Sequence, residues 1–587
     1  MTDQKKNKGL NPGLIRRILS YTRPYKKLFF GAVLITLLLS ALAIVRPLLI
    51  SKALNDYVTR QKDLKGLNAI CLLILFFLVF EAVCQIINLR ITNLLGQNIV
   101  RDLRNQVYKH ILYLKNAYFD TTPVGTLVTR AVSDIESLSN VFSEGFIVIA
   151  GDLLMLAVFI GAMFAKNWVL AFLALSTVPL LFVATALFKR GVKKTFTMVR
   201  NAVAALNTFT QEHITGMRLV QLFNREEPEF QKFKAINREH RIANIKSIFY
   251  YSIFFPVVEI LSSFSIAFII WFSGMKGNSY HIGLGDITFF IMMINMMFRP
   301  IRMLADRLNT LQMGIVSAER VFKVLDTDEK ISDEGTLKFE RVKSSIQFKD
   351  LWFAYQNDHY VLKNISFTIE AGQTVALVGA TGAGKSTIIN LLSRFYNYNR
   401  GGIFIDGVEI LQFQLESLRK NTGVVLQDVY LFNDSIVNNI TLNNPAIHFE
   451  DVVEATKKIG LYTYILSLPG GFDYQVTERG QSLSAGQRQL IAFIRAFVYQ
   501  PSIFILDEAT ATIDTQTEQL IQQAVEKISE GRTSIIIAHR LSTIRHVDRI
   551  LVFEKGEISE EGSIQELLSR DSKFKKLYEL QQSEVLN

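Results

Sequence analysis

The sequence is poor in cysteine and in charged residues. Cys71 and Cys84 are the only cysteines among 587 residues, which excludes a disulfide scaffold and a CxxC metal site. Both stand in an apolar stretch, so we expect them to pack as small hydrophobic side chains of a helix. Charged residues make up 20% of the chain and hydrophobic residues 49%, whereas soluble domains carry about a quarter charged residues. This composition disfavours a disordered chain, a fibrous repeat and an ordinary cytosolic enzyme.

The formal charge of +11 has two candidate explanations, nucleic-acid binding and an excess of Lys and Arg beside membrane spans. A membrane helix needs about 20 mostly apolar residues. Six segments meet this requirement: 28–50, 67–89, 142–165, 167–188, 247–274 and 285–305. They favour the membrane explanation, and we expect no nucleic-acid partner.

Basic residues predict the orientation of the spans. They are frequent before the first span and in the two long connections, 90–141 and 189–246. The positive-inside rule therefore predicts a multi-pass protein of the inner or plasma membrane with both termini in the cytoplasm. The start of the chain is basic and polar, so we expect no cleavable signal peptide. Residues 13–30 are predicted to form a short amphipathic helix on the inner membrane surface.

Acidic residues within spans are costly and often functional. Glu259 follows Pro256 in the middle of a span, and it is the candidate for a cavity-facing partner of a cation. A structural polar contact between helices is the alternative. Met292 and Met296 belong to a soft, adaptable surface that suits apolar substrates, with packing against lipid as the alternative. The sequence assigns no role to Glu81 or Asp152.

From about residue 345 short strands alternate with helices, as in an α/β domain. A buried strand, TVALVG, leads directly into a match to GxxxxGK[ST] that opens a helix, which is the context of a P-loop. Lys385 should reach the β- and γ-phosphates of a nucleotide, and Ser386 should bind Mg²⁺. The predicted nucleotide-binding residues here are Gly379, Ala380, Thr381, Gly382, Ala383, Gly384, Lys385, Ser386 and Thr387.

A second buried strand ends in two acids. Residues 502–506 are followed by Asp507 and Glu508, the Walker B pattern of four apolar residues before an acid. Asp507 is predicted to hold Mg²⁺, directly or through water. Glu508 is predicted to polarise the attacking water as a general base.

Between these motifs stands a pentapeptide, Leu483, Ser484, Ala485, Gly486 and Gln487. The order of P-loop, pentapeptide and Walker B resembles that of ATP-binding-cassette (ABC) ATPases. The whole chain resembles ABC exporters of the half-transporter type, similar to bacterial lipid-flippase and multidrug exporters. The predicted fold class is a multidomain membrane protein, with an N-terminal all-α six-helix transmembrane domain and a C-terminal α/β P-loop NTPase. The predicted boundaries are 1–325 for the membrane domain, 326–344 for a linker and 345–587 for the cassette.

The resemblance implies further site residues. Tyr355 matches the aromatic residue that stacks on adenine, and Gln427 matches the glutamine that senses Mg²⁺ and the γ-phosphate. Asp514 matches the D-loop aspartate, and His539 matches the switch histidine that contacts the γ-phosphate. Ala485 departs from the glycine common in the family, and we expect activity to survive this methyl group.

The resemblance also implies ATP and Mg²⁺ as ligands and a dimer as the working unit. The P-loop of one chain would face the signature of another, so the partner is a second half-transporter chain within membrane lipid. The expected substrate is amphipathic, lipid-like or drug-like and is exported by alternating access. A dedicated peptide exporter and the competent subunit of a heterodimer are the alternatives. The short segment before the first span argues against an N-terminal peptidase domain, and the presence of Glu508 argues against a channel or regulator.

Overall fold

The computed structural model describes residues 12–60, 62–277, 279–331, 333–356, 359–507, 515–538 and 543–586. The chain divides into two compact units, each considered by itself. The membrane unit comprises residues 1–112 and 124–328, and the cassette unit comprises residues 113–123 and 329–587. Residues 113–123 thus have their contacts in the cassette unit, although the sequence places them among the membrane spans.

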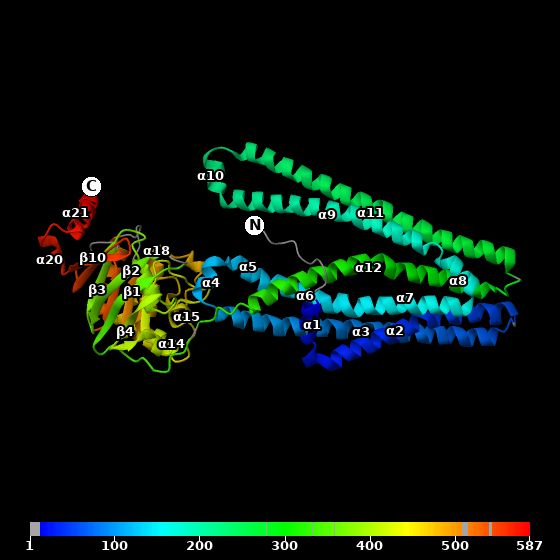
Figure 1. Cartoon of the computed structure of the whole chain (residues 1–587), viewed down its shortest axis with the longest axis horizontal. Coiled ribbons are helices and arrows are strands. Elements are labelled where there is room, and N and C mark those ends of the chain that lie inside the picture. The colour runs from blue at the N-terminus through cyan, green and yellow to red at the C-terminus, as the bar shows by residue number, and fades with distance from the viewer. Residues whose placement is uncertain are drawn as a thin grey trace. The chain divides into compact units, whose positions relative to one another are not determined.

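The membrane unit consists of helices (Figure 1). Among the described residues, six helical segments are long and apolar enough to cross a membrane. Their helices are α2 (Lys26–Lys52), α3 (Leu64–Leu112), α7 (Ile147–Lys166), α8 (Trp168–Leu175) with α9 (Val178–Thr215), α11 (Glu226–Lys276) and α12 (Leu284–Leu325). Shorter helices are α1 (Pro12–Ser20), α5 (Val124–Thr129), α6 (Ile135–Asn140) and α10 (Met217–Leu222). The six-span, all-α prediction is confirmed.

The fourth predicted span, 167–188, differs from the structure because it is two helices. Helix α8 ends at Leu175 and α9 begins at Val178, with a proline in the first turn of α9. Pro179 has no backbone N–H to donate to the preceding turn, so the helix is interrupted there. The start of α8 is fixed by Asn167, whose side-chain oxygen accepts from the backbone N–H groups of Val169 and Leu170 at 3.0 and 3.1 Å.

The cassette unit contains two sheets. An antiparallel sheet has the order β2-β1-β4-β5 and a six-stranded sheet has the order β10-β9-β3-β8-β7-β6. The strands are β1 (Ser345–Phe353), β2 (Leu362–Glu370), β3 (Thr374–Gly379), β4 (Arg400–Ile405), β5 (Val408–Glu409), β6 (Thr422–Val425), β7 (Ile503–Asp507), β8 (Thr533–Ile537), β9 (Arg549–Glu554) and β10 (Glu557–Gly562). In the larger sheet β6, β7, β8, β3 and β9 run parallel, which confirms the predicted α/β class.

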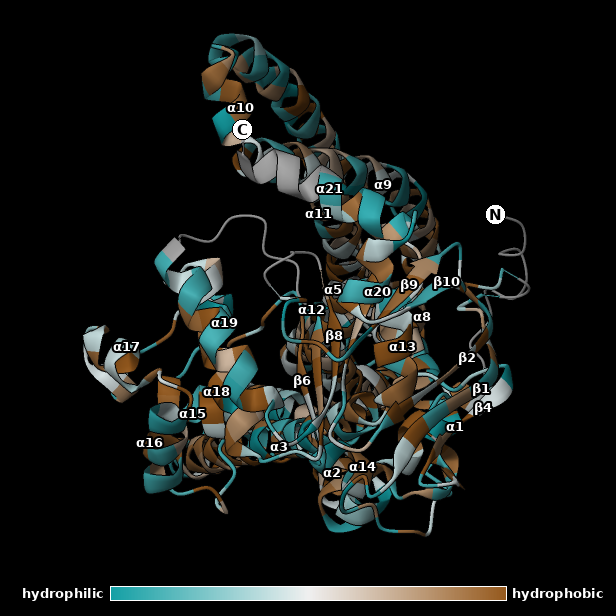
Figure 2. Cartoon of the chain, turned by 90° about the vertical axis from the view of Figure 1, so that its left-hand side faces the viewer, coloured by the Kyte–Doolittle hydropathy of each residue, from teal (hydrophilic) through white to brown (hydrophobic). Residues whose placement is uncertain are grey.

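Two hydrophobic cores cover opposite faces of the six-stranded sheet. Alternate residues of each strand enter different cores: Ala376 and Ile536 join one, and Val375 and Ile535 join the other. Helix α13 (Lys385–Leu392) packs into the second core, together with the antiparallel sheet. Helix α18 (Ala485–Val498) packs into the first. Figure 2 shows α18 and α13 on opposite sides of strands β6 and β8.

Smaller helices complete the cassette unit. They are α14 (Leu415–Lys420), α15 (Ile436–Thr441), α16 (Phe449–Lys458), α17 (Tyr462–Ser467), α19 (Thr515–Ser529), α20 (Ile564–Ser569) and α21 (Lys573–Leu586). Helix α4 (Asn116–Thr121) belongs to the same unit. The backbone N–H of Lys115 donates to the carbonyl of Glu329 at 2.8 Å, and Leu114 forms a β-bridge with Lys330. The segment before α4 is therefore tied to the chain that leads into the cassette.

Candidate nucleotide-binding site

The P-loop connects the carboxyl end of β3 to the first turn of α13. Gly379 and Gly384 have positive φ angles of 152° and 104°, a conformation that glycine adopts without steric cost. A side chain at Gly379 would collide with the backbone carbonyl of Phe553, and one at Gly384 would stand 2.6 Å from a methyl of Leu362. The loop therefore requires glycine at both positions, and it leads the chain into a helix N-terminus, which favours phosphate.

Lys385 is held inside this loop. Its ammonium group donates to the carbonyl oxygens of Gly379 and Ala380 at 2.6 and 3.0 Å, and only 5% of the residue is exposed. Burial lowers the pKa of Lys385, and the negative charge of Asp507 acts in the opposite direction. A buried cation at the phosphate-binding loop is suited to bind an anionic ligand, because low dielectric strengthens the attraction.

Asp507 and the P-loop lie at the same edge of the sheet. Strands β3 and β7 both pair in parallel with β8, and Leu377 and Asp507 are both opposite Ile537. Ligands of open α/β sheets bind at this carboxyl edge. Asp507 is 7% exposed, and Ser386 lies exposed in the first turn of α13. A carboxylate and a hydroxyl are suitable ligands for Mg²⁺, a hard cation that prefers oxygen.

Tyr355 is fixed close to the helix that follows the P-loop. Its hydroxyl donates to the hydroxyl of Thr387 at 3.3 Å and accepts from the side-chain amide of Asn390 at 3.1 Å. Both partners belong to α13. Tyr355 remains 43% exposed, so an aromatic face is accessible beside the P-loop helix, as stacking on a base requires.

The signature pentapeptide forms the N-terminus of α18. The hydroxyl of Ser484 accepts from the backbone N–H of Gln487 at 3.2 Å, and the side chain of Gln487 accepts from the N–H of Ser484 at 2.9 Å. This reciprocal capping box fixes the helix start. Leu483 and Gly486 are buried, whereas Ser484 and Ala485 are exposed. The methyl group of Ala485 therefore displaces no neighbour in the core.

Comparison with known proteins agrees with this geometry. Residues 29–301 match the ABC transporter transmembrane region and residues 362–511 match the ABC transporter family. The chain is 35% identical over 587 residues to the ABC transporter ATP-binding protein YknV of Bacillus subtilis, covering 100% of this chain and 97% of that protein. This chain belongs to the ABC transporter family.

Two further proteins similar to this ABC transporter carry more specific names. It is 35% identical to an ATP-dependent lipid A-core flippase of Syntrophus aciditrophicus, covering 97% of this chain and 94% of the flippase. The solved structure of a bacterial Atm1-family ABC exporter with ATP bound matches with a TM-score of 0.76 at 26% identity, covering 97% of this chain and 99% of that chain. The predicted family and fold are therefore confirmed, and the protein is a multi-pass ABC exporter whose cassette binds nucleotide and couples ATP hydrolysis to transport.

The predicted catalytic residues Glu508 and His539 and the predicted D-loop residue Asp514 lie outside the described residues. Gln427 is described: it follows β6 at the carboxyl edge of the sheet and is exposed. The structure thus brings Lys385, Ser386, Asp507 and Gln427 to one edge. The signature, in contrast, begins a helix that packs on the opposite face of the sheet from α13.

The candidate substrate residues occupy different environments in the membrane unit. Glu259 is exposed on α11, and Met292 and Met296 are half-buried on α12. Their neighbours Met293 and Met297 are buried in the core of the unit. Of the two acids without an assigned role, Glu81 accepts a hydrogen bond from Gln85 at 3.2 Å, and Asp152 forms an ion pair with Arg307 of α12.

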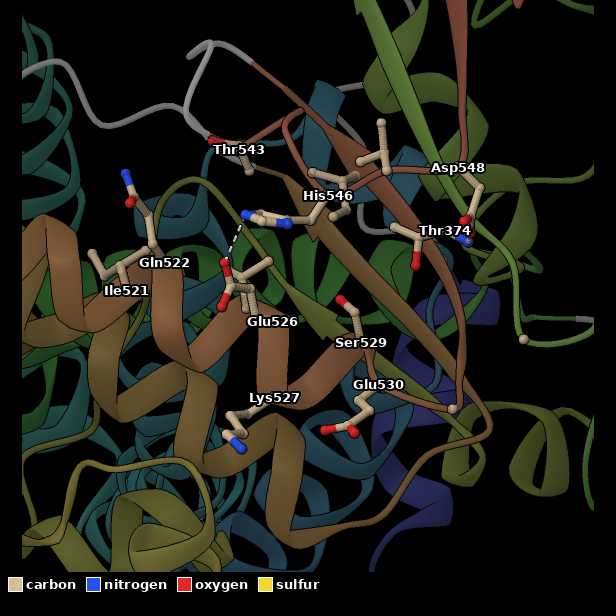
Figure 3. A pocket seen from close by; sticks show the side chains of 15 residues that line it. Thr374, Ile521, Gln522, Glu526, Lys527, Ser529, Glu530, Thr543, His546 and Asp548 are labelled. Carbon is tan, nitrogen blue, oxygen red and sulfur yellow. Dashed lines mark hydrogen bonds and ion pairs between the residues drawn. The ribbon is translucent and has the colours of Figure 1, made fainter. Parts of the chain in front are cut away.

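A separate pocket of about 450 Å³ lies in the cassette unit. Thr374, Gly531 and Asp548, at or before the starts of β3, β8 and β9, line it together with α19. It therefore opens at the amino edge of the sheet, opposite the P-loop. Figure 3 shows His546 directed toward Glu526, with its Nε2 3.0 Å from a carboxylate oxygen. Within the described part of the chain, no residue of the predicted site lines this pocket.

Sequence reasoning missed the residues that surround Tyr355. Asn390 holds its hydroxyl, and Tyr396 packs its ring edge-to-face against that of Tyr355 with centroids 5.0 Å apart. Tyr396 in turn donates a hydrogen bond to the carboxylate of Asp120. The helical spacing of Thr387 and Asn390 indicates a shared face of α13, but no local pattern could pair Tyr396 with a residue near position 120.

Proposed function

We propose that this ABC exporter moves amphipathic, lipid-like or drug-like compounds outward from the cytoplasm or the inner leaflet. The observation that supports this most is the combination of six apolar spans and one P-loop cassette in a chain similar over its length to a lipid A-core flippase. A second relative, 35% identical and covering 89% of this chain, is a probable multidrug resistance transporter of Bacillus subtilis. The first name refers to a lipid cargo and the second to multidrug resistance.

The cassette points to a dimer as the working unit. Helices α13 and α18 cover opposite faces of one sheet, so the P-loop and the signature of one chain begin helices on different faces. A second chain is needed to place a signature over the nucleotide. ATP would then be bound between Lys385 of one chain and Ser484, Gly486 and Gln487 of its partner, either an identical chain or a related one.

Each residue of the site has a proposed task. Lys385 neutralises the β- and γ-phosphates, Tyr355 stacks on the adenine, and Gln427 and His539 contact the γ-phosphate region. Ser386, Asp507 and Gln427 would hold Mg²⁺, which would supply charge neutralisation on the phosphates. Glu508 accepts a proton from the attacking water. Asp514 communicates between the two cassettes.

Glu259, Met292 and Met296 are the proposed contacts of the substrate, and both chain termini are proposed to be cytoplasmic.

ATP closes the cassettes by bridging two surfaces, and hydrolysis removes the bridge. Closure shifts the membrane spans from an inward-open to an outward-open state, because ATP binds one of the two states more tightly. The cytoplasmic connections, including α4 and α10, carry this change between cassette and spans.

The catalytic test is Glu508→Gln in the full chain reconstituted in lipid nanodiscs. We expect ATP to bind while steady-state hydrolysis falls by about 10²–10⁴-fold, the usual contribution of a general base. Glu526→Gln is the matched control, because Glu526 lies in the pocket at the opposite edge of the sheet. Hydrolysis by Glu508→Gln at the rate of the unmutated protein would remove Glu508 from this role.

The transport test uses inside-out proteoliposomes, in which the cassettes face the bath. ATP should drive a fluorescent phospholipid or a lipophilic cationic dye toward the lumen, and Lys385→Ala should abolish this movement. Absence of ATP-dependent movement for both probes, in vesicles that hydrolyse ATP, would contradict the proposed substrate class and leave the ATPase role intact.

A further inference from the structure

Tyr396 connects two parts of the cassette unit that lie far apart in the sequence. It follows α13, and its hydroxyl donates to the carboxylate of Asp120 in α4. Both residues belong to the cassette unit, and 276 positions separate them in the chain. The bond therefore joins the cassette to the first cytoplasmic connection between membrane spans.

The ring of Tyr396 belongs to an aromatic cluster that supports Tyr355. Phe353, Tyr355 and Tyr396 form this cluster. The ring planes of Tyr355 and Tyr396 meet at 87° with centroids 5.0 Å apart, and Phe353 is 4.8 Å from Tyr355 and 5.8 Å from Tyr396. Edge-to-face contacts of this kind favour one ring orientation over others. A shift of Tyr396 therefore changes the support of the Tyr355 ring.

Tyr355 is held on its other side by the P-loop helix. Its hydroxyl is bonded to the side chains of Thr387 and Asn390 at 3.3 and 3.1 Å. A continuous series of contacts thus runs from Asp120 through Tyr396 and Tyr355 to α13. Each contact in this series is made between side chains.

Residues 113–115, which precede α4 and Asp120, are held by hydrogen bonds to the chain that enters the cassette. Lys115 is bonded through its backbone to Glu329, and Ile331 donates to the carbonyl of Tyr113 at 3.4 Å. Leu114 is 3% exposed. Residues 113–115 are therefore fixed against the chain entering the cassette, and Asp120 extends the contact of this segment to the nucleotide side.

The hydroxyl of Tyr396 is a dependable donor. Burial raises the pKa of Tyr396, and the hydrogen bond to Asp120 raises it further. The phenol therefore stays protonated at neutral pH and donates to an ionised carboxylate. Hydrogen bonds to a charged acceptor are roughly twice as strong as neutral ones.

We propose that Tyr396 is a positioning residue that couples the adenine-stacking face of Tyr355 to the first cytoplasmic connection through Asp120. This inference rests on the proposed role of Tyr355 in binding adenine. Because coupling between two sites is reciprocal, adenine on Tyr355 stabilises the position of α4, and a displaced α4 weakens the binding of adenine. As a consequence, the affinity of the cassette for ATP depends on the position of α4 before hydrolysis takes place.

The test measures ATP binding in the full chain with four variants. Tyr396→Phe keeps the ring and removes the hydroxyl, and Asp120→Asn weakens the same bond from the other side. The double variant combines them. Tyr398→Phe is the matched control, since Tyr398 is also half-buried and donates to a carboxylate, that of Glu409, without contact to the aromatic cluster in the described contacts. Inorganic tripolyphosphate serves as a second probe because it binds the P-loop without a base.

We expect Tyr396→Phe and Asp120→Asn each to raise the Kd for ATP by about fivefold, the lower end of typical allosteric coupling. The double variant should show the same increase, because the two groups act through one bond. The Kd for tripolyphosphate in these variants should stay within about twofold of wild type. The Kd of Tyr398→Phe for ATP should also stay within about twofold. A non-hydrolysable ATP analogue should slow hydrogen exchange at residues 116–121 in the wild type and not in Tyr396→Phe.

Three results would overturn the coupling: an unchanged Kd for ATP in both single variants, additive effects in the double variant, or an equal loss of tripolyphosphate binding. Equal protection of residues 116–121 in the wild type and in Tyr396→Phe at saturating analogue would also refute it. Failure of the wild type to bind ATP, or of Tyr355→Leu to weaken that binding, would instead refute the proposed function on which the inference rests.

Discussion

In the membrane unit large apolar side chains such as Phe30, Leu34 and Ile86 are 66–68% exposed, whereas strands β7 and β8 of the cassette unit bury every residue. The buried positions of the membrane unit include small hydroxyl residues such as Ser40 and Ser265. The membrane unit therefore carries large apolar side chains on its outside, whereas these strands of the cassette unit lie in its interior. In a membrane, apolar side chains face the lipid and small polar side chains mediate contacts between helices. In water, the apolar side chains form the core.

Charged side chains also serve different purposes in the two units. In the cassette unit the buried cation Lys385 is bonded to backbone carbonyls of a ligand-binding loop. In the membrane unit Asp152 and Arg307 pair with each other between α7 and α12. The buried Lys385 thus serves ligand binding in one unit, and the partly buried Asp152–Arg307 pair joins two helices in the other. Four substitutions test this difference.

The largest effect on stability is expected for Arg307→Ala. The substitution leaves the carboxylate of Asp152, whose side chain is 13% exposed, without its ion-pair partner. Breaking a fully buried pair costs about 3–5 kcal/mol, and we expect a loss toward the lower end of this range at a partly buried one. Lys458→Ala is the control, because the Lys458–Glu454 pair on α16 is exposed and such pairs contribute at most about 1 kcal/mol. Thermal unfolding in nanodiscs measures both. Equal losses of stability for the two variants would contradict the claim that the Asp152–Arg307 pair joins helices of the membrane unit.

A lysine on an exposed apolar position should act differently in the two units. Val79 in α3 and Leu466 in α17 are 54% and 53% exposed. Val79→Lys places a charge in the middle of a membrane span and should cost about 2.5–3.5 kcal/mol. Leu466→Lys faces water and should stay within about 0.5 kcal/mol. The yield of membrane-inserted, folded protein compares them, and a normal yield for Val79→Lys would place this face of α3 in water.

These contrasts show which parts of the structure the sequence could predict. The P-loop, Walker B strand and signature are local patterns, and each depends on a turn or helix start that adjacent residues determine, such as the capping box of Ser484 and Gln487. The spans were predictable from apolar runs because bilayer thickness fixes their length. Even so, the interruption before Pro179 was missed, because hydropathy measures composition and not the loss of one backbone donor.

Contacts between distant segments were not predictable. The bridge between Leu114 and Lys330 and the bond between Asp120 and Tyr396 join segments more than 200 positions apart. No periodicity or spacing encodes such a pair, since only the tertiary fold of the cassette unit brings the two partners together. The aromatic cluster around Tyr355 was hidden for the same reason.

A smaller effect is expected from a hydroxyl between two spans. Thr177, before α9, is hydrogen-bonded to Ser265 of α11, and both residues are buried. Thr177→Val should cost about 0.6 kcal/mol, the average for such bonds in membranes, and at most about 1.7 kcal/mol. Thr185→Val is the control, because its hydroxyl bonds to Leu181 of its own helix. A larger loss for the control would indicate that bonds between helices do not hold this unit together.

The smallest effect is expected for Ala485→Gly, which restores the common residue of the family. Ala485 is exposed in the first turn of α18, and the helix is held by a capping box and by buried residues further along. We expect the ATPase rate to stay within about twofold, and helix stability to fall by less than the roughly 1 kcal/mol of an interior glycine. A tenfold change in ATPase rate would show that the methyl group lies at a contact made only with the partner chain.

The most direct test of the shared nucleotide site is a cross-link between different chains. Thr381→Cys in one chain and Ser484→Cys in another, with Cys71 and Cys84 replaced and Glu508→Gln present to retain ATP, place one thiol on a P-loop and one on a signature. With copper phenanthroline and air added as the oxidant, ATP with Mg²⁺ should promote a disulfide that joins two 66.7 kDa chains, and either substituted chain alone should give none. Saturating ATP without any product joining the two chains would contradict the shared site.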